Sequence, residues 1–209
     1  INRHEIQLIT KCGIQLPSEP RKVAIKHYDY SKAHIIWSVE NSLRNLQTDY
    51  LDLLLLHRPS PLMNSEVIGE SIAELKKEGK IQAFGVSNFS AEQISLINGK
   101  AEISANQIQF SAADLSAMTD GTIDFMVQHG IKTMAWNPLG NVFSDDTPQH
   151  IRIRKIAEAL SVKYEVVPFI ILLVWILQHP SGILPVCGTT NADRIAGLMK
   201  ATAIKLEIE

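Results

Sequence analysis

The stretch Leu53-Leu54-Leu55-Leu56-His57-Arg58-Pro59 places four leucines directly before a histidine, an arginine and a proline. An apolar run without alternation is typical of a strand that is buried on both faces, as in a parallel sheet covered by helices. Proline ends strand pairing because it has no backbone N–H. The stretch therefore predicts a buried strand over residues 51–56 that delivers His57 to the edge of a parallel sheet.

Five other short apolar runs repeat this pattern, at residues 7–12, 81–86, 103–108, 131–136 and 183–187. The segments between them predict helices at residues 32–47, from about 122 to 130, at 152–160 and at 168–177. A further helix carries Ile68, Ile72 and Leu75 and ends at Gly79, and another begins at a capping box from Ser90 to Gln93. Strands that alternate with helices indicate the α/β class. We expect a (β/α)8 TIM barrel with about six of its eight units present, in one domain of residues 1–209. A doubly wound sheet is the alternative, but its G-x-G-x-x-G motif does not occur.

Composition excludes several classes of protein. The 209 residues carry 20 Lys and Arg against 22 Asp and Glu, and the basic residues are scattered, so we expect no nucleic-acid partner. Two distant cysteines, Cys12 and Cys187, predict neither a disulfide scaffold nor a zinc module. The longest apolar run, residues 166–177, is shorter than the roughly 18–20 residues of a membrane span. A cytoplasmic protein with no membrane partner and no metal is expected.

Polar side chains follow nearly every predicted strand. In a barrel the carboxyl ends of the strands meet at one mouth, where catalytic residues lie. Taken singly, a lysine at a strand end is usually solvated, and a histidine there is as often structural as catalytic. Their convergence at one mouth is what indicates a site, formed by Lys11, His57, Ser87, Asn88, Asn106, Gln107, Trp136 and Asn137.

An ordered series of motifs runs from about Leu8 to Met199 and resembles the aldo-keto reductase family, in particular a bacterial oxidoreductase branch. The motifs are Leu43-Arg44-Asn45-Leu46-Gln47-Thr48-Asp49-Tyr50-Leu51-Asp52-Leu53, His57-Arg58-Pro59, Gly85-Val86-Ser87-Asn88-Phe89, Asn106-Gln107, Trp136-Asn137-Pro138-Leu139-Gly140, and Gly188-Thr189-Thr190 leading to Arg194.

The resemblance implies an enzyme that reduces a small aldehyde or ketone to an alcohol by hydride transfer from NADPH. Lys11 matches the family's catalytic lysine, which lowers the proton affinity of a tyrosine general acid. His57 matches the histidine that orients the carbonyl oxygen. A monomer or weak homo-oligomer is expected.

The resemblance also implies a set of cofactor contacts. Ser87, Asn88 and Gln107 match side chains that hold the nicotinamide carboxamide, and Trp136 matches an aromatic residue that stacks on its ring. Thr189, Thr190 and Arg194 match the site of the adenosine 2′-phosphate, beside a helix capped by Asn191. The remaining residues implied at the cofactor are Asn137, Leu139 and Gly188.

Some positions depart from the family pattern. Leu198 stands where an asparagine is usual and Gly188 where some members have lysine. The strand that carries Lys11 is the first of the sequence, so two further units, with the catalytic aspartate and tyrosine, are expected upstream of Ile1. Replacement of that tyrosine by Tyr28 or Tyr30 is disfavoured.

Two other functions stay open: a nucleotide-binding subunit that senses redox state or binds partners without efficient turnover, and a barrel whose motifs are relics. Residues that could line the substrate pocket are His27, Tyr28, Met63 and Phe110.

Overall fold

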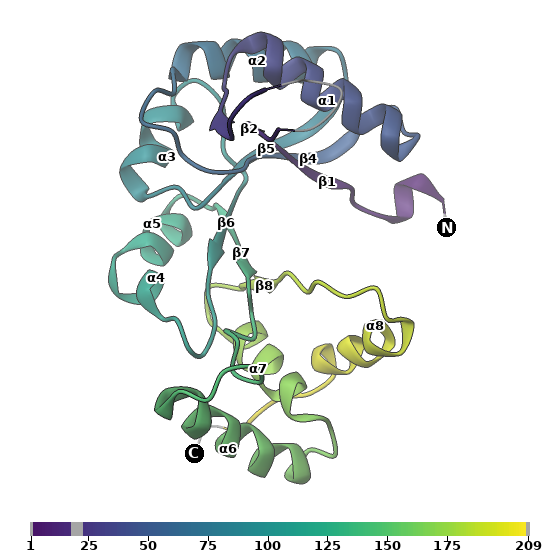
Figure 1. Cartoon of the computed structure of the whole chain (residues 1–209), viewed down its shortest axis with the longest axis vertical. Helices are drawn as coiled ribbons and strands as arrows, with labels where there is room; N and C mark the ends of the chain where they lie inside the picture. The colour runs from purple at the N-terminus through teal and green to yellow at the C-terminus, as the bar shows by residue number, and fades with distance from the viewer. Residues whose placement is uncertain (1, 18–22, 208–209) are drawn as a thin grey trace. The chain divides into compact units, whose positions relative to one another are not determined.

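The computed structural model describes residues 2–17 and 23–207. The chain forms two compact units, Ile1–Asn106 and Gln107–Glu209. Each has its own strands and helices (Figure 1). The expectation of one domain over the whole chain stays a prediction.

Parallel strands form the centre of the first unit. Strand β4 (Leu51–Leu56) pairs with β1 (Ile9–Cys12) on one side and with β5 (Ile81–Ser87) on the other. Strand β6 (Ala105–Gln109) begins in this unit and ends in the next. Leu54, Leu55 and Leu56 are at most 1% exposed, so the predicted burial on both faces is confirmed for these three residues, whereas Leu53 is only half-buried.

Three helices cover these strands: α1 (Lys32–Leu46), α2 (Ser65–Lys77) and α3 (Ala91–Asn98) (Figure 1). Ser31 caps α1 by accepting from the backbone N–H of His34. The predicted capping box of Ser90 and Gln93 begins α3. Helix α2 lays its apolar face, with Ile68, Ile72 and Leu75, into the core, because these residues recur at helical spacing.

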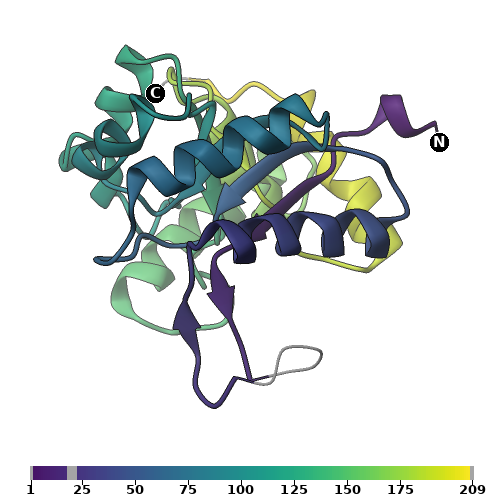
Figure 2. The same ribbon diagram turned by 90° about the horizontal axis from the view of Figure 1, so that it is seen from above.

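A short antiparallel hairpin leads from the end of β1 back to the start of α1. Its strands are β2 (Ile14–Gln15) and β3 (His27–Tyr28), and Figure 2 shows them as two short arrows beside each other. The sequence analysis missed this hairpin because two-residue strands carry no periodicity. It also missed the 3-10 helix η1 (Arg3–Glu5), where Arg3 binds the Asp52 carboxylate at 2.7 Å.

The second unit continues with β6, β7 (Lys132–Trp136) and β8 (Leu184–Pro185), of which β7 and β8 are paired in parallel. Its helices are α4 (Ser116–Thr119), α5 (Thr122–Gln128), α6 (Pro148–Lys163), α7 (Pro168–Leu177), α8 (Ala192–Leu198) and the 3-10 helix η2 (Met199–Thr202). Helix α6 starts four residues before the predicted residue 152, since Thr147 caps it and Pro148 occupies its first turn.

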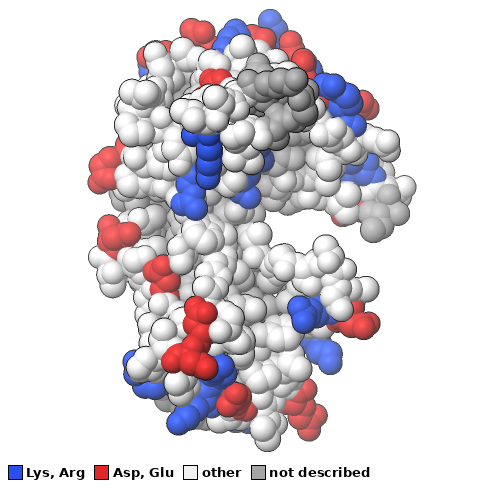
Figure 3. Space-filling view, in the orientation of Figure 1, with Lys and Arg blue, Asp and Glu red and all other residues white. Residues whose placement is uncertain are grey.

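Helix α7 is the core of the second unit. Ile170, Leu173 and Val174 are at most 2% exposed and pack with Ala201 of η2. Among the described residues no single helix has both the length and the apolar character of a membrane span; α6 and α7 meet that criterion only as a pair, bent by 95°. On the face drawn in Figure 3, acidic and basic side chains are interspersed.

Candidate functional site

Lys11 and His57 lie at the ends of neighbouring strands in the first unit. Lys11 is opposite Leu55 in the register of β1 and β4, and Cys12 is opposite Leu56. The backbone N–H of His57 donates to the carbonyl oxygen of Cys12 at 2.9 Å, so the pairing reaches the histidine itself. The fold therefore brings the two predicted catalytic residues to the same edge of the sheet.

The electrostatics of this edge favour an uncharged histidine. Burial lowers the pKa of His57 below its ordinary value, and the positive charges of Lys11, Arg58 and Lys26 lower it further. At neutral pH the imidazole is then a neutral ring with one N–H to donate. A neutral donor at a strand end can polarise a carbonyl oxygen without giving up its proton.

Lys11 is exposed, yet the surrounding protein desolvates its ammonium group enough to lower the pKa. In the described part of the chain no carboxylate forms an ion pair with it. A partly desolvated ammonium stabilises a nearby anion strongly, because little water screens its charge.

Ser87 and Asn88 follow the next strand. Ser87 is the last residue of β5 and is 2% exposed, and its Oγ accepts from the Asn88 Nδ2 at 2.8 Å. Asn88 has a φ of 61°, in the left-handed region that asparagine tolerates better than most residues. Because this turn ends the strand, it presents an amide and a hydroxyl at the same edge as His57, which follows the paired strand β4.

A hydrogen bond from the Asn106 side chain holds the turn that contains Asn88. The Asn106 side chain is fully buried, and its Nδ2 donates to the carbonyl oxygen of Phe89 at 2.9 Å. The neighbouring Oδ1 is buried without a hydrogen-bond partner. Asn106 therefore fixes the residue that follows Asn88 and contributes to the site through the turn.

The second unit holds the other predicted cofactor residues. Gln107 is 4% exposed on β6, and Trp136 ends β7. Asn137 then adopts a φ of 51°, which repeats the left-handed asparagine that follows β5. The sequence signal shared by both turns is an asparagine directly after a buried strand.

A cavity of about 390 Å³ opens beside the turn after β7. Its wall brings together five of the predicted cofactor residues, Asn137, Leu139, Gly188, Thr189 and Arg194, with Pro138, Phe169, Leu173, Val186, Cys187 and Leu198. Gln107, Trp136 and Thr190 do not line it. The sequence analysis did not assign the two α7 residues, Phe169 and Leu173, to the site; the only signal for them was the proline that begins their helix.

The segment after β8 is ordered by its own polar groups. Asn191 caps α8 by accepting from the backbone N–H of Arg194 at 2.9 Å, as predicted. The Thr189 hydroxyl accepts from the backbone N–H of Asn191 at 3.2 Å. These bonds leave the Arg194 guanidinium at the cavity wall, where it can bind an anion.

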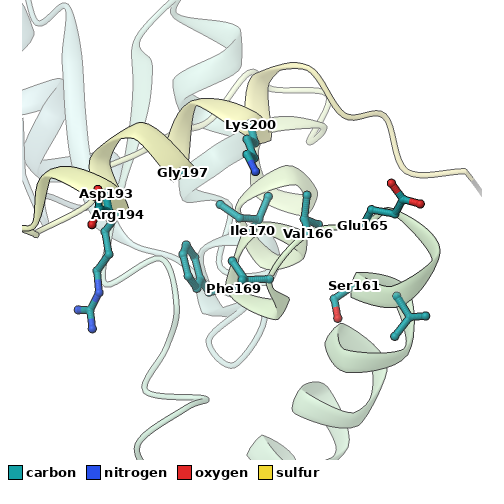
Figure 4. Close-up of a pocket in the computed structure, with 11 residues that line it drawn as sticks. Ser161, Glu165, Val166, Phe169, Ile170, Asp193, Arg194, Gly197 and Lys200 are labelled. Carbon is teal, nitrogen blue, oxygen red and sulfur yellow. The ribbon is translucent and has the colours of Figure 1, made fainter.

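A second cavity, of about 530 Å³, shares Phe169 and Arg194 with the first. Figure 4 shows its side chains coming from the end of α6, from α7 and the turn before it, and from α8 with η2. Apolar side chains, among them Val166 and Ile170, and the charged side chains Glu165, Asp193 and Lys200 line this cavity together. Arg194 therefore lines both cavities.

Three further residues named in the sequence analysis differ in burial. Phe110 lines none of the three cavities found in the described part of the chain; it is fully buried and stacks on Trp175 with ring centroids 5.6 Å apart. Tyr30 is a poor substitute acid, since burial raises the pKa of its hydroxyl. Tyr28 is 44% exposed and lines a cavity at the start of α1. Within the described residues no three His, Cys, Asp or Glu side chains gather to hold a metal.

Comparison with known proteins gives consistent matches. The model of the aldo/keto reductase family matches residues 2–209. The uncharacterized oxidoreductase YcsN of Bacillus subtilis is 40% identical over 98% of this chain and 70% of its own length. The 6-dehydroglucose reductase of Agrobacterium fabrum is 36% identical over 98% of this chain and 70% of its own length.

A solved structure has the same fold. The aldo/keto reductase from Klebsiella pneumoniae in complex with NADP and acetate superposes with a TM-score of 0.78, at 28% identity, over 98% of this chain and 67% of that one. The α/β class and the barrel-type succession of strands and helices are thereby confirmed. The chain belongs to the aldo/keto reductase family of oxidoreductases.

Proposed function

We propose that this chain acts in an NADPH-dependent reductase that converts an aldehyde or ketone to an alcohol. The observation that carries the proposal is the placement of Lys11 and His57 at the ends of two hydrogen-bonded strands, with Ser87 and Asn88 ending the third. Two named relatives, the 6-dehydroglucose reductase of Agrobacterium fabrum and the methylglyoxal reductase DkgB of Escherichia coli, support a carbonyl substrate.

The chain's own residues suit the cofactor. The turn of Ser87 and Asn88 offers both donors and acceptors to an amide such as nicotinamide carboxamide. Arg194 lines both cavities, and its guanidinium can bind a phosphate through paired hydrogen bonds. The structural neighbour from Klebsiella pneumoniae holds NADP, which supports the same assignment here.

In the reaction, NADPH when bound supplies a hydride to the carbonyl carbon, and a proton completes the alcohol. His57 donates a hydrogen bond to the carbonyl oxygen and stabilises the negative charge that develops there. Lys11 lowers the proton affinity of the group that gives the proton. Tyr30 is not that group, because its hydroxyl is bound to the backbone of Arg58.

The test is turnover by the native protein. With NADPH and a panel of small aldehydes and ketones, we expect loss of nicotinamide absorbance that depends on the carbonyl compound, with the matching alcohol as product. Tight binding of NADPH without oxidation would refute the reductase and favour a nucleotide-binding subunit. Absence of NADPH binding would refute both.

The choice of cofactor has its own test. Arg194→Ala should raise the Kd for NADPH by about 10-fold or more, since a charged hydrogen bond contributes roughly 1.5–3 kcal/mol. The Kd for NADH should stay unchanged. Arg152→Ala is the matched control, because Arg152 is an exposed arginine of α6 that lines neither cavity. Equal losses for both cofactors would argue against a contact with the 2′-phosphate.

A further inference from the structure

Tyr30 binds the backbone directly beside His57. The side chain comes from the segment between β3 and α1 and is 8% exposed. Its hydroxyl donates to the carbonyl oxygen of Arg58 and accepts from the backbone N–H of the same residue, at 3.3 Å for the latter. A single hydroxyl therefore satisfies both backbone groups of the residue that follows the histidine.

The ring of Tyr30 also presses on the segment that carries Lys11. A Cβ added to Gly13 would lie 1.8 Å from the Tyr30 Cε1, so the ring rests directly on the glycine backbone. Gly13 has a φ of +98°, and it lies two residues after Lys11. Tyr30 thus spans the ends of β1 and β4, one through its ring and the other through its hydroxyl.

The hairpin holds Tyr30 in this place. The backbone N–H of Asp29 donates to the carbonyl oxygen of Gly13 at 3.0 Å. The Asp29 carboxylate accepts from the Gln15 side chain at 2.7 Å and from the backbone N–H of Ser31 at 2.9 Å. Both sequence neighbours of Tyr30, Asp29 and Ser31, therefore form hydrogen bonds through their backbone N–H groups. These bonds limit movement of the Tyr30 ring away from Gly13.

Burial raises the pKa of Tyr30, which keeps its hydroxyl protonated. A protonated hydroxyl can donate to the Arg58 carbonyl and accept from the Arg58 amide at the same time, and a phenolate could only accept. The group is therefore suited to a structural contact and unsuited to proton transfer during the reaction.

We propose that Tyr30 is a positioning residue of the active site, which fixes the backbone after His57 against the end of the Lys11 strand and so sets the direction of the imidazole. This inference rests on the proposed reductase function for its kinetic consequence. Its structural part, the control of His57, stands on the contacts with Gly13 and Arg58 alone.

The experiment compares Tyr30→Phe with Tyr50→Phe in the native protein. Both variants lose one hydroxyl in the same unit, and the Tyr50 ring instead lies 3.8 Å under the Arg3 guanidinium. The measurements are kcat and KM for a carbonyl substrate, the Kd for NADPH, and the titration of the His57 ring by proton NMR. Lys11, Arg58 and Lys26 supply the charges that the ring senses.

For Tyr30→Phe we expect kcat to fall about 10-fold or more, because a small displacement of a catalytic group strongly lowers the reaction rate. The Kd for NADPH should change by less than about 2-fold. The pKa of His57 should rise toward its ordinary value as the ring gains solvent. Tyr50→Phe should leave all of these unchanged. A kcat loss without any change in the His57 titration, or a parallel loss of NADPH binding, would overturn the proposal.

Failure of the reductase function and failure of the Tyr30 contact give different results. If the unsubstituted protein reduces no carbonyl compound, the reductase function fails and the His57 titration alone decides the role of Tyr30. If Tyr30→Phe does not fold, hydrogen exchange of the Arg58 amide in the unsubstituted protein decides it. Protection of that amide supports the contact, and exchange at the rate of an open loop refutes it.

Discussion

Replacement of Gly13 by alanine tests how tightly the end of β1 is packed. Gly13 has a φ of +98°, which an L-residue rarely adopts, and the new Cβ would lie 1.8 Å from the Tyr30 Cε1. The backbone cannot keep its conformation without strain, and the ring cannot keep its place. We expect Gly13→Ala to destabilise the native protein clearly.

The magnitude follows from two contributions. A left-handed backbone costs an L-residue about 1–2 kcal/mol. Displacement of Tyr30 removes its two hydrogen bonds to Arg58, which contribute about 0.5–1.5 kcal/mol each. The free energy of unfolding should therefore fall by about 2–5 kcal/mol, a large share of the roughly 5–15 kcal/mol of a native protein.

The assay is urea unfolding, with Gly79→Ala as the matched control. Gly79 also has a positive φ, +70°, but nothing lies within 4 Å of its added Cβ, so that variant carries the backbone cost alone. Gly13→Ala should lose about 1–3 kcal/mol more than the control. Equal losses for the two variants would show that the Tyr30 ring yields freely, and the packing argument would be refuted.

Three further outcomes are expected for the site. Lys11→Met should lower kcat for carbonyl reduction by about 100-fold or more while NADPH still binds, and wild-type turnover would remove Lys11 from the mechanism. Asn106→Leu should weaken NADPH binding, measured by cofactor fluorescence, because the carbonyl of Phe89 loses its donor; unchanged binding would contradict a supporting role. The lowered pKa of His57 means that the unfolded chain takes up a proton first as pH falls below about 6.5. This contribution to stability is therefore complete above that pH and is lost as pH falls through the folded-state pKa, so urea titrations of His57→Gln should show a shallower loss than the unsubstituted protein.

Patterns of hydrophobicity predicted most of the regular structure. The leucine run of β4, the helical spacing of α2 and the capping box of α3 each follow from interactions within a few residues. For the same reason the residues at strand ends, His57 and Ser87 among them, were found from the sequence. Short elements were not: the hairpin of β2 and β3 has two residues in each strand, too few for any period to appear.

The sequence by itself determined the succession of strands and helices, and it determined which polar side chains follow the strands, because both depend on local periodicity and on the chain order of residue types. Only the tertiary structure decided what supports those side chains. The contact of Tyr30 with Gly13 and Arg58, and that of Asn106 with Phe89, join residues 17 to 28 positions apart. Such contacts arise from the packing of separate segments, and no local pattern encodes them.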